Sequence, residues 1–481
     1  MSNLFATQQL ERAARFLWGL VLLTLPVTSF RYMPDFMGRT LIQPLAFYPL
    51  VLLLPVLLVL FWRARRVPLP SNVNLLLAFL LFAAIGSLLG ALYAPLPLRG
   101  ALYEERVLRG WFSLLIGLAF FFAAFWMNRS EQDLQHSLKW IYASLALTIL
   151  WSLLQALALN SSLIPRSLVN QIQLLFSVRP LLQRRISGFA YESAWLADQI
   201  VIFYLPWVFA AFFTGRALLK RRWLEPLLIL LSLAVLVFTY SRGGLLSAAL
   251  CILVVFVLLG RDLIRRAWRW LLRPPSAPGF WMRLGLVVVL SVTVFAAGSF
   301  LSRYEYFSNL WDLGEEEDPL SYLVDIGAGQ RLAYAVAGYQ VYEEQPLTGV
   351  GLGASGLYLL PYYPNWSFVI PEVARQLSPY SDLIPNTKNL YVRLLAETGL
   401  PGFWLFIVFF VSFLAMSLRM HASGSRFLRF VAVAGLFIWI AVALRNLTQD
   451  SFTIPIMWVA LGFLAGLDTH APKQFRLKGK P

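Results

Sequence analysis

The sequence predicts an all-α polytopic membrane protein, and its composition supports that prediction in three ways. Of the 481 residues, 59% are hydrophobic and only 13% are charged, whereas a soluble domain is about a quarter charged and under half apolar. The apolar residues gather in runs long enough to cross a bilayer. The net charge of +16 needs no nucleic-acid partner, because basic residues orient the loops of membrane proteins.

We expect about twelve transmembrane helices, because twelve apolar runs approach the roughly 20 residues that span a hydrocarbon core of about 30 Å. The runs cover residues 14–31, 40–62, 73–93, 108–127, 138–159, 195–214, 223–240, 243–260, 282–301, 400–418, 427–444 and 452–467. Arg12 and Arg15 precede the first run and no small-residue cleavage site follows it. The first helix is therefore expected to be retained rather than removed as a signal peptide.

The charge pattern predicts the orientation of these spans. A cytoplasmic N-terminus places most of the 40 basic residues in the shorter inner segments, as the positive-inside rule requires. Both termini are then expected in the cytoplasm. The chain divides into spans one to nine (1–301), a large outer loop (302–397), and spans ten to twelve with a basic cytoplasmic tail (398–481).

Two outer segments are longer than a connection needs, one near 160–194 and the other at 302–397. The second carries many Tyr, Trp, Pro and Gly residues and is too apolar for a disordered linker. We expect it to form helices on the outer face of the membrane and to be functional. Ionisable residues are scarce within the spans, with Asp198 near an outer end as the main exception. This scarcity argues against a proton or ion carrier.

A helix start is predicted at Pro385-Asn386-Thr387-Lys388-Asn389-Leu390-Tyr391. Either Asn386 or Thr387 is expected as the N-cap. On such a helix, Lys388 falls on the apolar face, while Asn389, Arg393 and Glu397 share a polar face. A lysine on the apolar face beside the positive end of the helix dipole suggests a functional site. The alternative is that Lys388 only extends to water.

The positive-inside rule makes arginines unusual on the predicted outer face, so each of them needs an explanation. One group lies in Arg184-Arg185-Ile186-Ser187-Gly188-Phe189-Ala190-Tyr191-Glu192, and Tyr240-Ser241-Arg242-Gly243-Gly244 is a tight turn with Arg242 at a helix start. Guanidinium groups and helix N-termini bind phosphate, so Arg185, Arg242 and Lys388 together suit a diphosphate. Alternatively, Arg242 anchors a helix end and Arg185 pairs with Glu192 or with lipid headgroups.

The remaining motifs point away from nucleotide and metal chemistry. The stretch Gly349-Val350-Gly351-Leu352-Gly353 resembles a nucleotide loop, but without a preceding strand it is weak evidence, and close backbone packing is favoured. There is one cysteine, and the three histidines all fall in segments predicted to be cytoplasmic. A cysteine-based metal site and a histidine-ligated metal on the outer face are therefore not expected, and we predict no cofactor.

Several motifs together resemble the bacterial O-antigen ligase superfamily, which also holds O-antigen polymerases and O-linked protein oligosaccharyltransferases. Lys388-Asn389, nine residues and then Gly399-Leu400-Pro401-Gly402 is similar to the family pattern of His-Asn, nine residues and Gly-x-x-Gly. Further matches are Arg185 to Glu192, Ser241-Arg242-Gly243, and Arg331 leading to Pro346-Leu347-x-Gly349-Val350-Gly351. The resemblance covers residues 180 to 402 and fits the layout of spans and loop.

The resemblance implies a membrane-embedded, metal-independent glycosyltransferase of a bacterial inner membrane, with its active site on the periplasmic face. The donor is then a glycan on undecaprenyl diphosphate, and the acceptor is a hydroxyl of a glycan or glycolipid such as lipid A core. By position, Arg185 and Arg242 match the family's diphosphate-binding arginines, and Lys388 stands where the family has a histidine that is thought to activate the acceptor. We expect Lys388, Arg242, Arg185 and Glu192 as catalytic residues and Arg184, Arg331, Asn389 and Arg393 as substrate contacts.

Other functions remain open on the sequence alone. A polysaccharide polymerase would use a second lipid-linked glycan as acceptor, although its superfamily members tend to have two sizeable outer loops. A polysaccharide exporter or a non-catalytic assembly protein is possible if Lys388 marks lost activity. Lys388 itself is expected either to hold the diphosphate as a cation or to act as a base, and Glu192 either orients Arg185 or accepts a proton.

Overall fold

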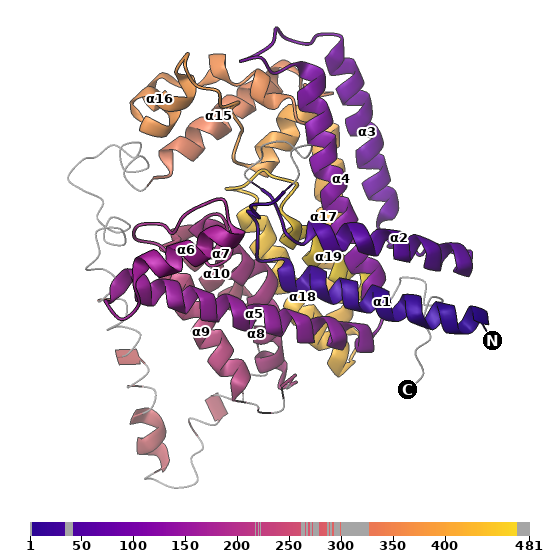
Figure 1. Cartoon of the computed structure of the whole chain (residues 1–481), viewed down its shortest axis with the longest axis vertical. Coiled ribbons are helices and arrows are strands. Elements are labelled where there is room, and N and C mark those ends of the chain that lie inside the picture. The colour runs from indigo at the N-terminus through magenta and orange to yellow at the C-terminus, as the bar shows by residue number, and fades with distance from the viewer. Residues whose placement is uncertain are drawn as a thin grey trace.

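The computed structural model describes residues 2–33, 42–216, 223–260 and 327–468, with isolated positions among residues 218–299. The regular secondary structure of this part of the chain is helical (Figure 1), which confirms the predicted all-α class for it. The helices are α1 (Ser2–Thr24), α2 (Phe47–Ala64), α3 (Val73–Ala91), α4 (Tyr103–Met127), α5 (Glu131–Asn160), α6 (Arg166–Phe176), α7 (Ser193–Asp198), η2 (Gln199–Tyr204), α8 (Leu205–Thr214), α9 (Leu224–Phe238), α10 (Arg242–Leu259), α15 (Gly329–Glu344), η3 (Ser355–Leu357), η4 (Leu360–Tyr362), η5 (Asn365–Val369), α16 (Pro371–Leu377), α17 (Leu390–Ala422), α18 (Arg426–Arg445) and α19 (Pro455–Leu467).

Among the described residues, eight helical segments are long and apolar enough to cross a membrane: α2, α3, α4, α5, α7 to α8, α10, α17 and α18. Two further expected spans are the shorter apolar helices α9 and α19. The first expected span lies in α1, which begins earlier than predicted and carries charged residues in its first half. The ninth, at 282–301, falls mostly outside the described residues. The membrane class is confirmed, and the count of twelve stays a prediction.

The membrane bundle is held by close approach of its helices at small residues. The pair α4 and α19 shows this clearly. A Cβ on Gly117 would lie 2.1 Å from the Trp458 ring, and one on Gly462 would lie 2.4 Å from Phe121 O. Small residues let helix backbones approach in a membrane, where packing rather than water exclusion drives association. The core around these contacts is fully buried and includes Trp18 and Trp207.

Two hydrogen bonds join segments that the sequence assigns to the same side of the membrane. At the end predicted to be cytoplasmic, Ser71 in the α2–α3 turn donates a hydrogen bond to Asp468 at the end of α19 (2.8 Å). At the opposite end, the hydroxyl groups of Ser29 after α1 and Ser177 after α6 lie 2.8 Å apart. Both contacts agree with the predicted alternation, and the orientation in the membrane stays a prediction.

Residues 327–389 form a compact unit, here called the outer lobe, at the top of Figure 1. It contains α15, α16 and the three short 3₁₀ helices, and it has a core of its own around Ala333, Tyr334, Leu359 and Val373. Tyr103 at the start of α4 belongs to the same core, so the lobe is packed on the ends of membrane helices. The expectation of helices in this loop is confirmed for its described part.

The other long outer segment, near 160–194, is also structured. It contains α6 and a small core in which Trp151 and Val169 are buried together. Gln155 of α5 organises the rest: its Nε2 donates to Gly188 O (3.0 Å) and its Oε1 accepts from the N–H groups of Ser187 and Gly188 (3.1 and 2.8 Å). The buried amide therefore fixes the segment that carries Arg184 and Arg185.

Candidate functional site

Lys388 lies in a strained turn before α17, which corrects the predicted helix start. Asn389, not Asn386 or Thr387, is the N-cap, and its Oδ1 accepts from the N–H groups of Tyr391 and Val392 (3.0 and 3.2 Å). The φ of Lys388 is 48°, a left-handed conformation that non-glycine residues rarely adopt. The prediction failed because the side chain of Asn389 caps better placed N–H groups than the two candidates before it.

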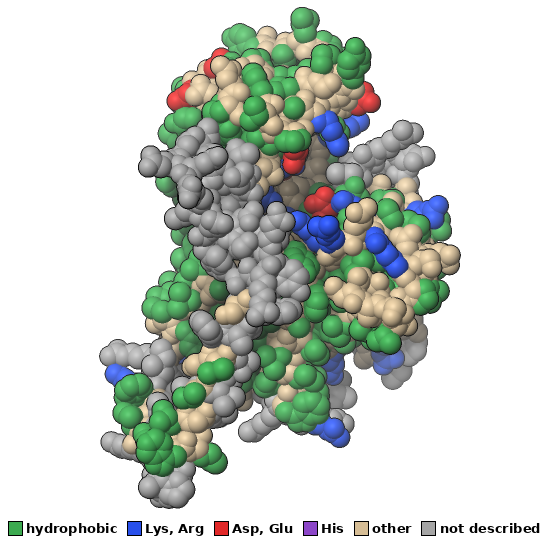
Figure 2. Space-filling view, turned by 90° about the vertical axis from the view of Figure 1, so that its left-hand side faces the viewer, with side chains coloured by type: hydrophobic (Ala, Val, Ile, Leu, Met, Phe, Trp, Pro, Cys, Tyr) green, Lys and Arg blue, Asp and Glu red, His purple; other side chains and the backbone are tan. Residues whose placement is uncertain are grey.

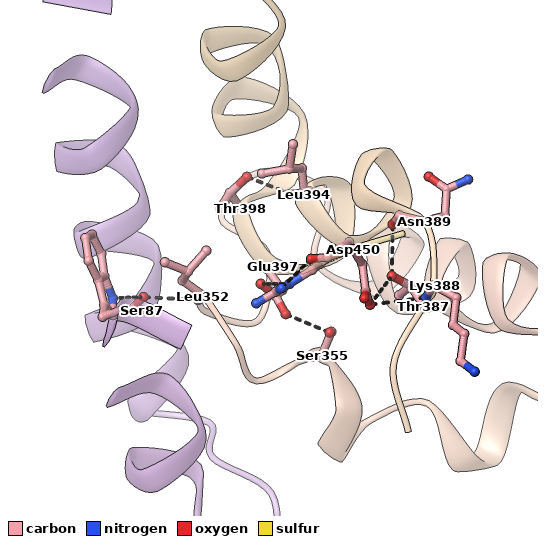
Figure 3. A network of polar contacts seen from close by, with 12 residues as sticks. Ser87, Leu352, Ser355, Thr387, Lys388, Asn389, Leu394, Glu397, Thr398 and Asp450 are labelled. Atoms are coloured by element: carbon pink, nitrogen blue, oxygen red, sulfur yellow. Dashed lines mark hydrogen bonds and ion pairs between the residues drawn. The ribbon is translucent and has the colours of Figure 1, made fainter. Parts of the chain in front are cut away.

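The loop between α18 and α19 holds this turn in place. Asp450 Oδ2 accepts from the Lys388 N–H (3.1 Å) and from Thr387 Oγ1 (3.4 Å), and the Leu390 N–H donates to Asn446 O (2.8 Å). Strain of this kind, of order 1–3 kcal/mol, persists only where the surroundings over-determine it, and it clusters at functional sites. Figure 3 shows the Lys388 side chain pointing away from these contacts.

The Lys388 side chain is the cation of an ion pair in the outer lobe. Its Nζ donates to Glu372 Oε1 at 2.6 Å and lies 5.3 Å from the centre of the Tyr334 ring. Tyr334 donates its hydroxyl to the same Glu372 oxygen at 3.0 Å. Lys388 is 36% exposed and Glu372 43%. The predicted burial of Lys388 on an apolar helix face is therefore wrong, because the residue precedes the helix.

Glu372 is ionised at neutral pH. Burial acts to raise its pKa, but hydrogen bonds from Lys388 and Tyr334 and the charges of Lys388 and Arg331 outweigh burial, so the pKa lies below its ordinary value. Burial, followed by the charge of Glu372, raises the pKa of Tyr334. The phenol therefore remains a donor to the carboxylate. The buried Tyr334 and the partly exposed Lys388 and Glu372 thus form a cluster of fixed charge and hydrogen-bonding direction.

The predicted polar face of α17 is present, and its side chains make contacts within the protein that stabilise the fold. Arg393 Nε donates to Glu397 Oε2 (2.9 Å), Arg393 Nη1 donates to Asp450 O (2.6 Å), and Ser355 Oγ donates to Glu397 Oε1 (2.8 Å). The Arg393 and Glu397 side chains are only 13% and 2% exposed, and Asn389 is occupied as the cap. We therefore assign Asn389 and Arg393 as positioning residues, and a substrate contact for either stays a prediction.

The glycine-rich stretch at 349–353 packs backbone on backbone, as the sequence favoured. The N–H groups of Val350 and Gly351 donate to the carbonyls of Ala396 and Glu397 (2.9 and 3.0 Å), where α17 breaks at Gly399 with φ 61°. A Cβ on Gly349 would lie 2.4 Å from the backbone of Glu397. The motif thus docks the outer lobe on the start of α17.

A second ion pair lies at the end of α18, which adjoins the start of α17. Arg445, at the end of α18, approaches Asp198 of α7 with Nε to Oδ2 at 2.6 Å, and the side chains are 12% and 13% exposed. Asp198 directly precedes the π-helical turn η2, a distortion that is frequent at functional sites. Arg331 of α15 lies within electrostatic range of both residues and of Glu372.

The predicted arginines Arg185 and Arg242 lie on neighbouring segments of the bundle. The Ile186 N–H donates to Phe238 O at the end of α9 (3.3 Å). Arg242 is the first residue of α10, as predicted, with Ser241 as N-cap. A Cβ on Gly244 would lie 2.6 Å from the side chain of Ala197, so the start of α10 packs beside Asp198. Arg184 and Arg185 are exposed, whereas Arg242 is half-buried.

Glu192 has a partner that the sequence did not suggest. Its Oε1 accepts from Arg179 Nη1 at 3.1 Å, and the Arg179 guanidinium also lies over the Tyr191 ring at 4.7 Å. The structure thus gives Glu192 a role in anchoring residue 179 on the segment before α7. Glu192 is also within electrostatic range of Asp198 and Arg445, so it belongs to the edge of the same charged region.

Figure 2 shows Lys and Arg side chains gathered around a hollow between the outer lobe and the bundle, with acidic side chains on both rims. Sequence reasoning missed Glu372, Tyr334 and Asp450, because nothing in their spacing ties them to Lys388. Arg445 could have been chosen as a candidate from the sequence, because it is a further arginine on the predicted outer side. The arrangement can hold an anion between cations from two layers of the protein.

Comparison with known families supports the resemblance seen in the motifs. Residues 227–407 match the family described as O-antigen ligase. No curated protein matches the chain. The matched residues include Arg242, Arg331, Glu372 and Lys388, whereas Arg185 and the Asp198–Arg445 pair lie outside them. The chain is a membrane protein in which residues 227–407 match the O-antigen ligase family.

Proposed function

We propose that this protein is a glycosyltransferase that moves a polysaccharide from undecaprenyl diphosphate to a hydroxyl acceptor on the outer face of the inner membrane. The observation that carries the proposal is the placement of Arg331. It lies in electrostatic range of Glu372, the partner of Lys388, and of the Asp198–Arg445 pair. The outer lobe and the membrane helices therefore contribute charge to one site at the end of the bundle.

In the proposed reaction the acceptor hydroxyl oxygen attacks the anomeric carbon of the donor glycan. The bond between that carbon and the diphosphate oxygen breaks, and the diphosphate leaves with the bonding electron pair. Arg185, Arg242 and Lys388 stabilise the charge that develops on the leaving group, a contribution that removal of a single donor typically reveals as a loss of about 10²–10³ in rate. The hydroxyl proton passes late to a phosphate oxygen, and Glu192 is the alternative acceptor.

The Lys388–Glu372 pair favours the role of Lys388 as an electrostatic clamp. A lysine that donates to an ionised carboxylate at 2.6 Å is a cation, and a cation cannot accept a proton from the acceptor hydroxyl. Glu372 and Tyr334 then act as positioning residues, because they fix where the ammonium group stands. No step in this scheme calls for a metal ion, since the charge of the leaving group is met by side chains.

Reconstituted protein tests the proposal. In liposomes that contain an undecaprenyl-diphosphate-linked glycan and a hydroxyl acceptor, the enzyme is expected to release carrier lipid and to form a new glycosidic bond. An exporter would move the glycan across the bilayer without changing its linkage, and that result would overturn the proposal. In a deletion strain, carrier-bound full-length chains indicate a ligase, whereas loss of chain length indicates a polymerase.

The arginine site has its own test. Arg185→Ala and Arg242→Ala are each expected to lower donor turnover by about 10²-fold or more while the protein inserts and purifies normally. Arginine to lysine changes should restore only part of the activity, because the planar two-pronged donor is lost. Arg166→Ala, at the start of α6 on the same side, is the matched control. Near-normal turnover in both alanine variants would show that these arginines only anchor the segments.

A further inference from the structure

A separate hollow opens between α5 and α9, at the end of the bundle opposite to the proposed active site. Its volume is about 630 Å³, within the range of ligand pockets in proteins. The walls are mainly apolar, and the polar groups stand at one end. The lining residues are Gln135, Leu138, Lys139, Tyr142, Ala143, Ala146, Arg216, Leu218, Leu219, Leu224 and Leu228.

The length of the hollow matches one leaflet of a bilayer. The α5 residues that line it run from Gln135 to Ala146, a rise of roughly 16 Å at 1.5 Å per residue. Half of a hydrocarbon core of ~30 Å is about the same depth. Ala143 and Ala146 are exposed, and their small side chains leave the groove open towards Leu224 and Leu228.

Two polar side chains of α5 at this hollow have no hydrogen-bond or ion-pair partner among the described residues. Lys139 is exposed and makes no ion pair or hydrogen bond with any residue that the structure describes. One turn along the helix, Tyr142 is 7% exposed, and its hydroxyl finds no hydrogen-bond partner among the described residues. A buried hydroxyl without a partner is unfavourable by about 1–3 kcal/mol, so a ligand that accepts its hydrogen bond would be stabilised.

The other charged groups at the hollow are already engaged. Arg216 pairs with Glu131, and its guanidinium lies over the Phe427 ring at 5.2 Å. Glu225 is 2% exposed and accepts from the N–H groups of Leu218 and Leu219 at 2.9 and 3.1 Å. These contacts fix the floor of the hollow. They leave Lys139 as the described cation at its mouth that is available to an anion.

We propose that this hollow binds a phospholipid of the adjacent leaflet. The phosphate lies at Lys139, an ester oxygen accepts from Tyr142, and an acyl chain follows Ala143, Ala146 and Leu228 between the two helices. A soluble anion would use the cation and leave the apolar groove empty, whereas a phospholipid satisfies both. The lipid joins α5 to the short helix α9, and this role is independent of the proposed transfer reaction.

Lipid retention tests the proposal. Protein purified in mild detergent from bilayers of phosphatidylethanolamine and phosphatidylglycerol is analysed by intact mass spectrometry. Wild type is expected to keep one phospholipid more than Ala146→Trp, which fills the groove, and Lys139→Glu, which repels the phosphate. Arg12→Glu, an exposed charge reversal on α1 at the same end, should keep it.

The outcomes distinguish which kind of lipid the hollow binds. Retention from bilayers of either headgroup indicates recognition of the shared phosphate diester, and retention only with phosphatidylglycerol indicates an added requirement for net negative charge. Equal lipid counts in wild type and Lys139→Glu would overturn the proposal, as would a polyprenyl lipid or detergent in place of the phospholipid. Lys139→Glu changes an exposed residue, so it keeps the test decisive even if Ala146→Trp fails to fold.

Discussion

Lys388 and Glu372 form an ion pair across the outer lobe, with Nζ 2.6 Å from Oε1. The lysine comes from a left-handed turn before a membrane helix, and the glutamate from the first turn of α16. The pair joins the lobe to the start of α17 and holds a positive charge beside Glu372 and the Tyr334 ring. Two roles are open to Lys388 in this pair. It can act as a cation that holds the leaving group, or as a base that accepts a proton.

Substitutions at Lys388 separate those two roles. Lys388→Arg should retain substantial transfer activity, because a cation remains beside Glu372, whereas Lys388→Met should lose about 10²–10³ in rate. Turnover of purified variants on the lipid-linked donor is the measurement. If Lys388→Arg were dead and Lys388→His active, a proton-accepting group would be required and the clamp would be wrong.

The pH dependence of the pair follows from the pKa of Glu372. Because that pKa is lowered below its ordinary value of 4.5, the pair contributes its full stability above pH 4.5 and loses it as the pH falls through the lower, folded value. The Tm difference between wild type and Glu372→Gln should therefore stay constant from pH 8 to pH 5. It should shrink only under more acidic conditions. A difference that changes between pH 6 and pH 8 would contradict this assignment.

Removal of one partner from the Asp198–Arg445 pair should destabilise the bundle strongly. Asp198→Asn leaves the Arg445 charge buried without its carboxylate, and such changes are unfavourable by about 3–5 kcal/mol. Glu105→Gln, which breaks the exposed pair with Arg109, is the control and should change stability by only about 0.3–0.5 kcal/mol. Denaturant unfolding in detergent measures both, and similar effects would show that burial of the first pair has no energetic importance.

The close contact of Gly349 with α17 predicts that alanine substitutions at Gly349 and at Gly243 differ strongly in their effect on stability. Gly349→Ala places a Cβ 2.4 Å from the Glu397 backbone at φ 64°, so the loop must move or the lobe detach. We expect a large loss of folded protein on size-exclusion chromatography. Gly243→Ala meets no atom within 4 Å and should be neutral or stabilising by about 0.5–1 kcal/mol. Equal yields would mean that the lobe does not depend on this contact.

Topology is tested by single cysteines. Cys251 is fully buried, so a Cys251→Ser background removes the only native thiol without exposing a new one. Tyr380→Cys in the outer lobe and Ser425→Cys at the start of α18 should react with an impermeant reagent from opposite sides of the membrane. Reaction from the same side would refute the predicted orientation of α17.

The sequence alone determined the membrane class and most of the helices, and it predicts the sides on which their loops lie. Those properties follow from local composition, because a bilayer selects apolar runs and basic residues orient loops. The start of α10 at Arg242 was also readable, since Ser241 caps it locally. The sequence also favoured a packing role for the glycine-rich stretch at 349–353, because a nucleotide-binding loop would follow a strand and none is predicted there.

Only the tertiary structure decided what surrounds Lys388. Its turn is set by Asp450 and Asn446, which lie about sixty residues away in the chain, and its charge is met by Glu372 on another helix. Likewise, Asp198 finds Arg445 only when α7 and α18 lie together. Such pairings depend on which helices become neighbours in the folded bundle, and no periodicity or spacing within one segment carries that information.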